Sequence, residues 1–340
     1  MKWQVSHDYV NKSNTKLKKR GMPMPQVEIS SKTKPLAKKS HLHRFLKQWD
    51  IQLMVLPAMM FILIFSYIPM YGVLMAFQDY SLFKGFLNSP WVGFKHFDAF
   101  FGTPEFWTIM RNTLVIGMLK LCIGFPAPIL LAVMLNEVGK HSFKRIVQTI
   151  SYLPHFLSWV IVSGFVISIL STDNGSLNIL LQKLSLIDEP INFLSEPKYF
   201  WSILTVTNVW KEIGFSSIVY LAAIAGINPQ LYEAASIDGA SRLKQIFSIT
   251  IPSIMPIIVV FSILAIGNFL NAGFEDILLL GGNPVLRDVS DVLDTYVYRI
   301  GIQNSRYSYA TAAGLFKAII SVVLLSGANY WARRSGNSLW

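Results

Sequence analysis

Long runs of apolar residues, separated by shorter polar stretches, dominate the chain after residue 50. Six of these runs reach the length of about 20 residues that a helix needs to cross the hydrocarbon core of a bilayer. The pattern therefore predicts an all-α integral membrane protein with six transmembrane helices. The predicted spans are Ile51–Phe77, Thr108–Leu135, Ile146–Leu170, Trp201–Ala225, Ser253–Leu280 and Ser308–Tyr330.

The polar stretches predict which side of the membrane each loop faces. With six spans both termini lie on one side, and placing them inside gives 19 Lys or Arg in internal segments against seven in external loops. Basic residues concentrate on the cytoplasmic side, so both termini are predicted to be cytoplasmic. The predicted parts are a basic tail at 1–50, a membrane domain at 51–330 and a short C-terminus at 331–340. The predicted external loops, 78–107, 171–200 and 281–307, are interpreted as surface caps.

The composition excludes other classes of protein. Hydrophobic residues make up 52% and charged residues 14%, against about a quarter charged in soluble proteins. With a mean hydropathy of +0.43, the chain has too few charges for a soluble surface and is too apolar to be disordered as a whole. Its single cysteine, Cys122, excludes an internal disulfide framework and a multi-cysteine metal site, and no metal site is predicted.

The basic tail holds most of the net charge. Residues 1–50 contain twelve Lys or Arg and three acids, and thus nine of the eleven net positive charges. Nucleic-acid binding is one interpretation, but the tail lacks interleaved aromatics for base stacking. We therefore predict no nucleic-acid partner, and a tail that fixes topology and contacts anionic lipid. A cleavable signal is not predicted, because the following apolar run is too long.

The cytoplasmic segment 226–252 is more elaborate than a simple connector. Pro229–Asp238 contains good helix formers with an apolar face, and Gly239 can end that helix in a left-handed conformation. Ser241 can cap a second helix, and this helix is expected to end at Pro252, where the chain enters the membrane. Because these two short helices carry few charges, they expose apolar surface, which is costly unless a partner protein covers it.

This segment resembles the coupling loop of permease subunits in binding-protein-dependent ABC importers. The family pattern is E-A-A, three residues, G, nine residues, then I-x-L-P. The chain has Glu233-Ala234-Ala235, then Gly239, then Ile249-Thr250-Ile251-Pro252, with Ile251 replacing Leu. The alternative is an incidental re-entrant or interfacial helix.

Other stretches are similar to the carbohydrate-type permeases of this superfamily, and within them to the branch for oligosaccharides released from polysaccharides, including uronate-containing ones. Importers of glutamine, phosphate or amino acids share the coupling loop, so these other stretches are what distinguishes a carbohydrate-type permease from them. They are Tyr67–Gly72, Trp91–Phe94, Arg111–Leu114, Phe125–Pro128, Asp294–Tyr298 and Ala310–Leu315.

The resemblance implies a type I ABC importer permease fold in which the coupling helix sits in a cleft of an ATPase subunit. Glu233 would face a basic group there, while Ala234, Ala235 and Gly239 would allow close approach. The implied coupling set also includes Asp238, Ile249 and Pro252. Closure of two ATPases would then drive alternating access.

The implied partners are a second homologous permease, two P-loop ATPases, an extracytoplasmic solute-binding protein and an oligosaccharide, in a bacterial cytoplasmic membrane. The chain has no G-x-x-x-x-G-K-[ST] motif, so ATP and Mg²⁺ belong to the ATPases. It is not predicted to be an enzyme. A secondary carrier or channel, the main alternative, would explain six spans but not the coupling pattern.

Ionisable residues within spans are costly and are therefore candidates for function. Lys120, Lys211 and Lys317 are expected near mid-membrane, with Glu212 as the one acid at that depth. Asp276 is expected roughly 35 Å beyond Pro252, near the outer face. Three cations against one acid leave two positive charges unpaired. One hypothesis is that these lysines line a pathway for an acidic sugar. The alternative is that they snorkel to the interface, cap backbone carbonyls or pair with charges on a partner permease.

Asn268 and Asn271 are a second candidate for the substrate pathway. At a spacing of i, i+3 on the fifth span they are expected to share a helix face. In sugar permeases of this type, residues at about this distance after the coupling loop contact ligand hydroxyls. Interhelical hydrogen bonding is the alternative.

Overall fold

The computed structural model describes residues 48–334 and 336, so the predicted basic tail, except its last three residues, lies outside the described residues. The described residues form helices joined by loops, with a single isolated β-bridge between Gln78 and Trp91 in place of any strand. The all-α prediction is confirmed over this part of the chain.

The described residues divide into two units, with the boundary between Tyr67 and Ile68. In the first unit, α3 (Trp49–Ile62) continues into a π-helical turn at Leu63–Tyr67, and neither element buries a residue. The second unit opens with a 3₁₀ segment at Ile68–Phe77. Its α-helices are α4 (Gly85–Asn88), α5 (Lys95–Phe101), α6 (Glu105–Leu119), α7 (Pro126–Glu137), α8 (His141–Tyr152), α9 (Trp159–Leu170), α10 (Ser176–Lys183), α11 (Pro197–Ala225), α12 (Pro229–Ile237), α13 (Arg242–Gln245), α14 (Ile251–Gly267), α15 (Glu275–Leu280), α16 (Arg287–Ser290), α17 (Leu293–Tyr298) and α18 (Tyr307–Arg333).

Four helical stretches among the described residues are long and apolar enough to cross a membrane, and two bent helix pairs bring the number to as many as six. The four stretches are Trp49–Phe77, Glu105–Glu137, Arg242–Gly267 and Tyr307–Arg333. They overlap four of the predicted spans, and α11 covers a fifth.

The third predicted span, Ile146–Leu170, is wrong as a continuous helix. The chain bends by 105° between His141–Phe156 and Trp159–Leu170. Pro154 lies in the 3₁₀ turn before the bend, where a proline interrupts the helical hydrogen-bond ladder. Ser158 then starts α9, because its hydroxyl accepts a hydrogen bond from the backbone N–H of Ile161 at 3.4 Å.

The fifth predicted span differs at both ends. Pro252 does not close a helix, because the helical stretch runs without interruption from Arg242 to Gly267. A π-helical turn at Ile246–Thr250 directly precedes α14 and widens the helix where the proline ring would meet the carbonyl of the preceding turn. The helix then ends at Gly267, and residues 268–274 are not α-helical before α15 begins.

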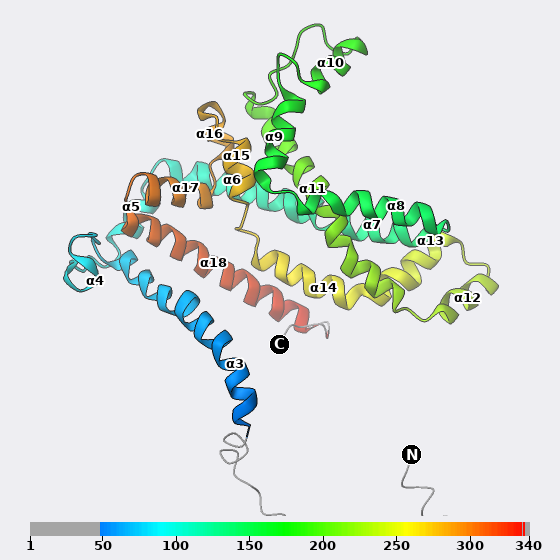
Figure 1. The fold of residues 1–340 in the computed structure, drawn as a ribbon, viewed down its shortest axis with the longest axis horizontal. Coiled ribbons are helices and arrows are strands. Elements are labelled where there is room, and N and C mark those ends of the chain that lie inside the picture. The colour runs from blue at the N-terminus through cyan, green and yellow to red at the C-terminus, as the bar shows by residue number, and fades with distance from the viewer. Residues whose placement is uncertain (1–47, 335, 337–340) are drawn as a thin grey trace, which may run out of the picture. The chain divides into compact units, whose positions relative to one another are not determined.

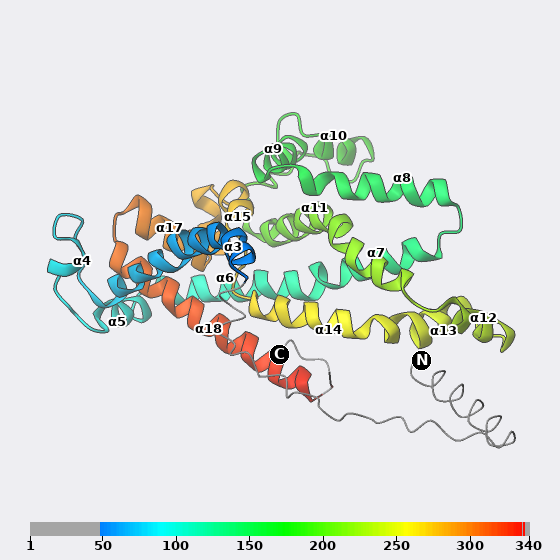
Figure 2. The ribbon, with the colours of Figure 1, turned by 60° about the horizontal axis from the view of Figure 1, so that its bottom comes forward.

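Two long helices organise the packing of the second unit (Figures 1 and 2). α11 packs against α7, α8 and α14, and α18 packs against α14, α17 and α5. α8 and α11 approach closely at Gly214, where an added Cβ would lie 2.0 Å from the backbone oxygen of Ser151. Only a glycine fits such a contact, and small residues of this kind bring membrane helices together.

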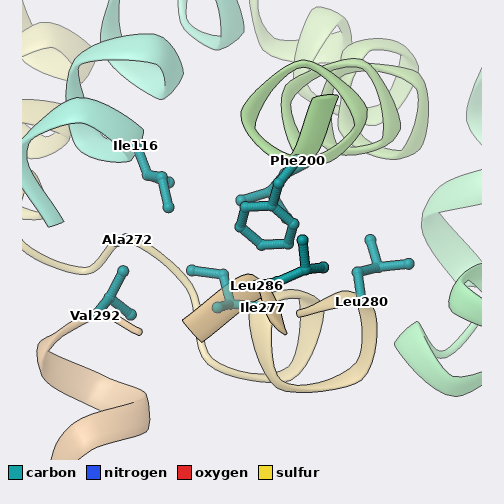
Figure 3. Close-up of a cluster of buried hydrophobic side chains, with 8 residues drawn as sticks. Ile116, Phe200, Ala272, Ile277, Leu280, Leu286 and Val292 are labelled. Carbon is teal, nitrogen blue, oxygen red and sulfur yellow. The ribbon is translucent and has the colours of Figure 1, made fainter. Parts of the chain in front are cut away.

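The predicted external loop 281–307 is more than a surface cap. Leu286 and Val292 from this segment join the buried cluster shown in Figure 3, where they face Phe200 of α11 and Ile116 of α6. A second buried cluster contains Leu293, Tyr296 and Ile300, together with residues of α5, α6 and α18. The segment therefore packs between helices and helps fix their positions.

Candidate functional site

The first half of the coupling loop is a capped helix that ends in a left-handed turn. Asn228 starts α12, because its side-chain oxygen accepts from the backbone N–H of Gln230 at 3.0 Å. Pro229 occupies the first turn, where its missing N–H costs little. Gly239 has a φ of +74°, so the prediction that this glycine ends the helix in a left-handed conformation is confirmed.

The second half of the loop is fastened back onto the first. Ser241 caps α13 through Lys244 N–H at 3.4 Å, as predicted. The Gln245 amide donates to the Ser236 hydroxyl and to the Ala240 carbonyl, both at 3.1 Å. The Tyr232 and Thr250 hydroxyls are hydrogen-bonded at 2.9 Å, which ties α12 to the base of α14. Side-chain hydrogen bonds therefore hold α12 against the start of the helix that leads into α14.

The loop exposes the residues that the resemblance selected for coupling. Glu233, Ala234, Asp238 and Gly239 are exposed and Ala235 is half-buried. Ile249 is half-buried in the π-helical turn and Pro252 is exposed at the start of α14, so these two lie outside the α12 turn itself.

Apolar side chains surround this exposed set. Ile237 is 87% exposed, Leu243 68% and Phe247 71%. An open hollow of about 910 Å³ borders α12, and Glu233, Ile237 and Arg242 belong to its mixed polar and apolar lining. Exposed apolar side chains beside such a hollow are suited to a protein partner.

Lys120 is paired, contrary to the expectation of two unpaired cations. Its ammonium lies 2.9 Å from the carboxylate of Asp276, whose side chain is 4% exposed. The Asn208 amide also donates to this carboxylate at 3.4 Å. The expected position of Asp276 assumed a straight fifth helix, and the break at 268–274 invalidates that assumption.

Lys211 and Glu212 form a cluster at the bend between α8 and α9. Lys211 donates to the His155 carbonyl at 2.9 Å and lies 3.2 Å from the Glu212 carboxylate. That carboxylate also contacts the His155 ring at 2.8 Å, and the ring stacks on Phe215. Sequence spacing gave no signal for His155, because 57 residues separate it from Glu212.

Lys317 is also paired within the chain. Its ammonium contacts the carboxylate of Asp294 in α17. Nearby, Arg299 contacts the Asp291 carboxylate, which also accepts from the Thr295 hydroxyl. Each of the three predicted lysines therefore has a carboxylate partner in this chain, so no charge on another permease is needed to neutralise it.

Asn268 and Asn271 lie in the break after α14 and not on one helix face, which corrects the prediction. The Asn271 amide donates to the Asn268 side-chain oxygen at 2.8 Å, and both residues are exposed. Because residues 268–274 leave the α-helix, this pair presents side-chain amides beside non-helical backbone. In membrane proteins such backbone is tolerated where it is buried in protein or lines a water-filled cavity.

A helical membrane domain with an exposed, capped coupling loop defines a transporter permease. Residues 124–336 match the family described as "Binding-protein-dependent transport system inner membrane component", and the chain belongs to this family. The resemblance found in the sequence is thereby confirmed.

Individual relatives and solved structures agree with this assignment. The chain is 46% identical over 299 residues to the polygalacturonan/rhamnogalacturonan transport system permease protein YteP of Bacillus subtilis (strain 168), covering 88% of this chain and 92% of YteP. It is 45% identical to Protein LplB of the same organism, covering 84% of this chain and 88% of LplB. It also superposes with a TM-score of 0.81 and 43% identity on a chain of a bacterial alginate ABC transporter in complex with alginate pentasaccharide-bound periplasmic protein, covering 88% and 99% of the two chains.

Proposed function

We propose that this chain is one of two permease subunits of an ATP-driven importer for an acidic oligosaccharide. It would span the bacterial cytoplasmic membrane six times, with both termini in the cytoplasm. The observation that carries the proposal is the coupling loop, whose exposed α12 is tied by hydrogen bonds to the long helix that begins at Arg242.

In this proposal the coupling loop transmits movement of the ATPase to the membrane helices. Glu233 contacts a basic group in the ATPase cleft, and the small side chains of Ala234 and Ala235 allow close approach. Asp238 and Gly239 shape the turn. Ile249 and Pro252 lie where the loop joins α14, so they are proposed to pass the movement onward and not to touch the ATPase.

The break in the fifth span is the proposed substrate contact. Asn268 and Asn271 offer exposed amides to sugar hydroxyls, and their mutual hydrogen bond sets their orientation. Lys120, Lys211, Glu212 and Lys317 are proposed to organise the wall of this pathway through their ion pairs. Because Lys211 is only 5% exposed, its replacement should impair uptake of acidic and neutral cargo alike.

The proposed cargo and partners follow from the relatives. YteP is named for polygalacturonan and rhamnogalacturonan, and a similar solved bacterial ABC transporter is described as involved in the import of the acidic polysaccharide alginate. At 43–46% identity, an acidic oligosaccharide is the cargo class we propose. The complex would contain a second permease, two ATPases that bind ATP and Mg²⁺, and an extracytoplasmic binding protein.

Affinity purification of the chain from its native membrane tests the assembly. We expect a second permease and a P-loop ATPase to co-purify. Glu233→Arg should reduce recovery of the ATPase without reducing recovery of the second permease, because Glu233 is exposed on α12. Glu189→Arg, an exposed acid in the predicted external loop, is the matched control and should change neither. A chain recovered alone, or only with copies of itself, would contradict the proposal and favour a carrier or channel.

A further inference from the structure

A small cavity with both polar and apolar lining residues lies among α15, α16, α17 and the π-helical turn Arg299–Gln303. Its volume is about 160 Å³, close to that of cavities of about 150 Å³ that hold a benzene molecule. Buried Ser290, Asp291 and Thr295 are part of the lining, and exposed Arg287 and Gln303 contribute to its rim. The cavity can therefore admit one six-membered ring, or one charged group with water.

The charges that line this cavity do not balance. Arg299 contacts Asp291 in an ion pair and lies over the Tyr296 ring. Arg287 also lines the cavity, and its guanidinium has no hydrogen bond or ion pair with any residue that the structure describes. Glu105 also lies 3.9 Å from the Arg299 guanidinium, so two carboxylates offset Arg299. Arg287 is therefore the lining cation whose charge no described carboxylate offsets.

Unused hydrogen-bond donors accompany this excess charge. The Tyr298 hydroxyl and the Gln303 amide line the cavity and, within the described residues, make no hydrogen bond. The planar fork of an arginine donates two parallel hydrogen bonds to a carboxylate. Arg287 and these two neutral donors are therefore suited to an anion with several acceptor oxygens, such as a carboxylate on a hydroxylated ring.

We propose that this cavity binds the carboxylate of an acidic sugar residue, with Arg287 as the residue that recognises it. The inference rests on the proposed function, in which the cargo is an acidic oligosaccharide. The cavity also borders the proposed pathway. The Tyr298 ring packs against Phe274, with ring centroids 5.2 Å apart, and Phe274 ends the non-helical segment that carries Asn268 and Asn271.

A thiol-labelling experiment on the reconstituted complex tests whether Arg287 contributes a positive charge at the cavity. The single cysteine is removed by Cys122→Ser, and a thiol is placed on the rim by Pro284→Cys, an exposed lining residue that offers no hydrogen-bond donor. Labelling of this chain is then compared for an anionic and a cationic methanethiosulfonate. Arg287→Gln should slow the anionic reagent and speed the cationic one by about threefold to fivefold each, the effect of one unit charge a few ångströms away in a high dielectric. Lys198→Gln, which removes an exposed cation outside the cavity, should leave the ratio unchanged, and an unchanged ratio in Arg287→Gln would overturn the proposal.

Protection by sugar tests the ligand. With the binding protein omitted, trigalacturonate should slow labelling of the rim thiol severalfold, and the carboxyl-reduced trisaccharide should not. Arg287→Gln should abolish this protection. Equal protection by both sugars, no protection by either, or equal protection by the binding protein without sugar would overturn the assignment, the last result indicating a carboxylate of that protein.

A parallel measurement separates this proposal from the function on which it rests. Stimulation of ATP hydrolysis by sugar-loaded binding protein is recorded on the same proteoliposomes. Its absence would contradict the proposed function. Its presence together with unresponsive labelling would contradict the cavity assignment alone.

Discussion

Gly239 is the single residue on which the shape of the coupling loop depends most directly. Its φ of +74° lies in the left-handed region, which costs a residue with a Cβ roughly 1–2 kcal/mol. This conformation lets Ala240 N–H reach back to the Ala235 carbonyl at 2.9 Å and close α12. A change here alters the loop without touching the membrane helices.

Gly239→Ala should weaken coupling while leaving the protein folded. A strain of about 1 kcal/mol shifts a two-state equilibrium about fivefold, so we expect ATPase stimulation by loaded binding protein to fall severalfold. The matched control is Gly226→Ala. Its φ of −83° suits alanine, and the added Cβ would lie 3.4 Å from its nearest neighbour outside the adjoining residues. Equal loss in both variants would show that the left-handed turn is not what matters.

At the scale of helices, the sequence predicts the helix ends that depend on residues close to each other in the chain. Asn228, Gly239 and Ser241 each act within three or four residues, so the limits of α12 and the start of α13 could be inferred. The pairing of Lys120 with Asp276 could not, because 156 residues separate them. It depends on the break after Gly267, which no proline marks.

The Lys120–Asp276 pair predicts a distinctive pattern of stability. Removing one partner of a buried pair leaves an uncompensated charge and costs about 3–5 kcal/mol, whereas removing both costs much less. Lys120→Met should therefore lower the thermal midpoint of the purified complex, and Lys120→Met with Asp276→Asn should recover most of the loss. A double variant less stable than either single one would contradict the pairing.

The α8–α11 contact predicts a second effect at this scale. Gly214→Val would drive a side chain into the Ser151 backbone and separate the helices, so we expect a severe loss of folded protein in membranes. Gly164→Val in α9 is the control, because nothing lies within 4 Å of an added Cβ there. Fluorescence-detected size-exclusion chromatography of both variants provides the measurement. Comparable yields would show that the close approach is not required.

For the whole molecule, the composition and the apolar runs were enough to predict a helical membrane protein, and the coupling pattern was enough to predict its family. The sequence could not show that the third and fifth spans are broken, because hydropathy records apolar length and not direction. Those breaks position groups of the proposed pathway. His155 contacts Glu212 at one break, and Asn268 meets Asn271 at the other.

Transport by the reconstituted complex tests the central claim most directly. The chain is incorporated into proteoliposomes with the permease and ATPase that co-purify with it, and uptake of trigalacturonate is measured. We predict uptake only when ATP is present on the ATPase side and the binding protein is present on the other. Uptake by this chain alone, without ATP or binding protein, would contradict the importer and identify a carrier.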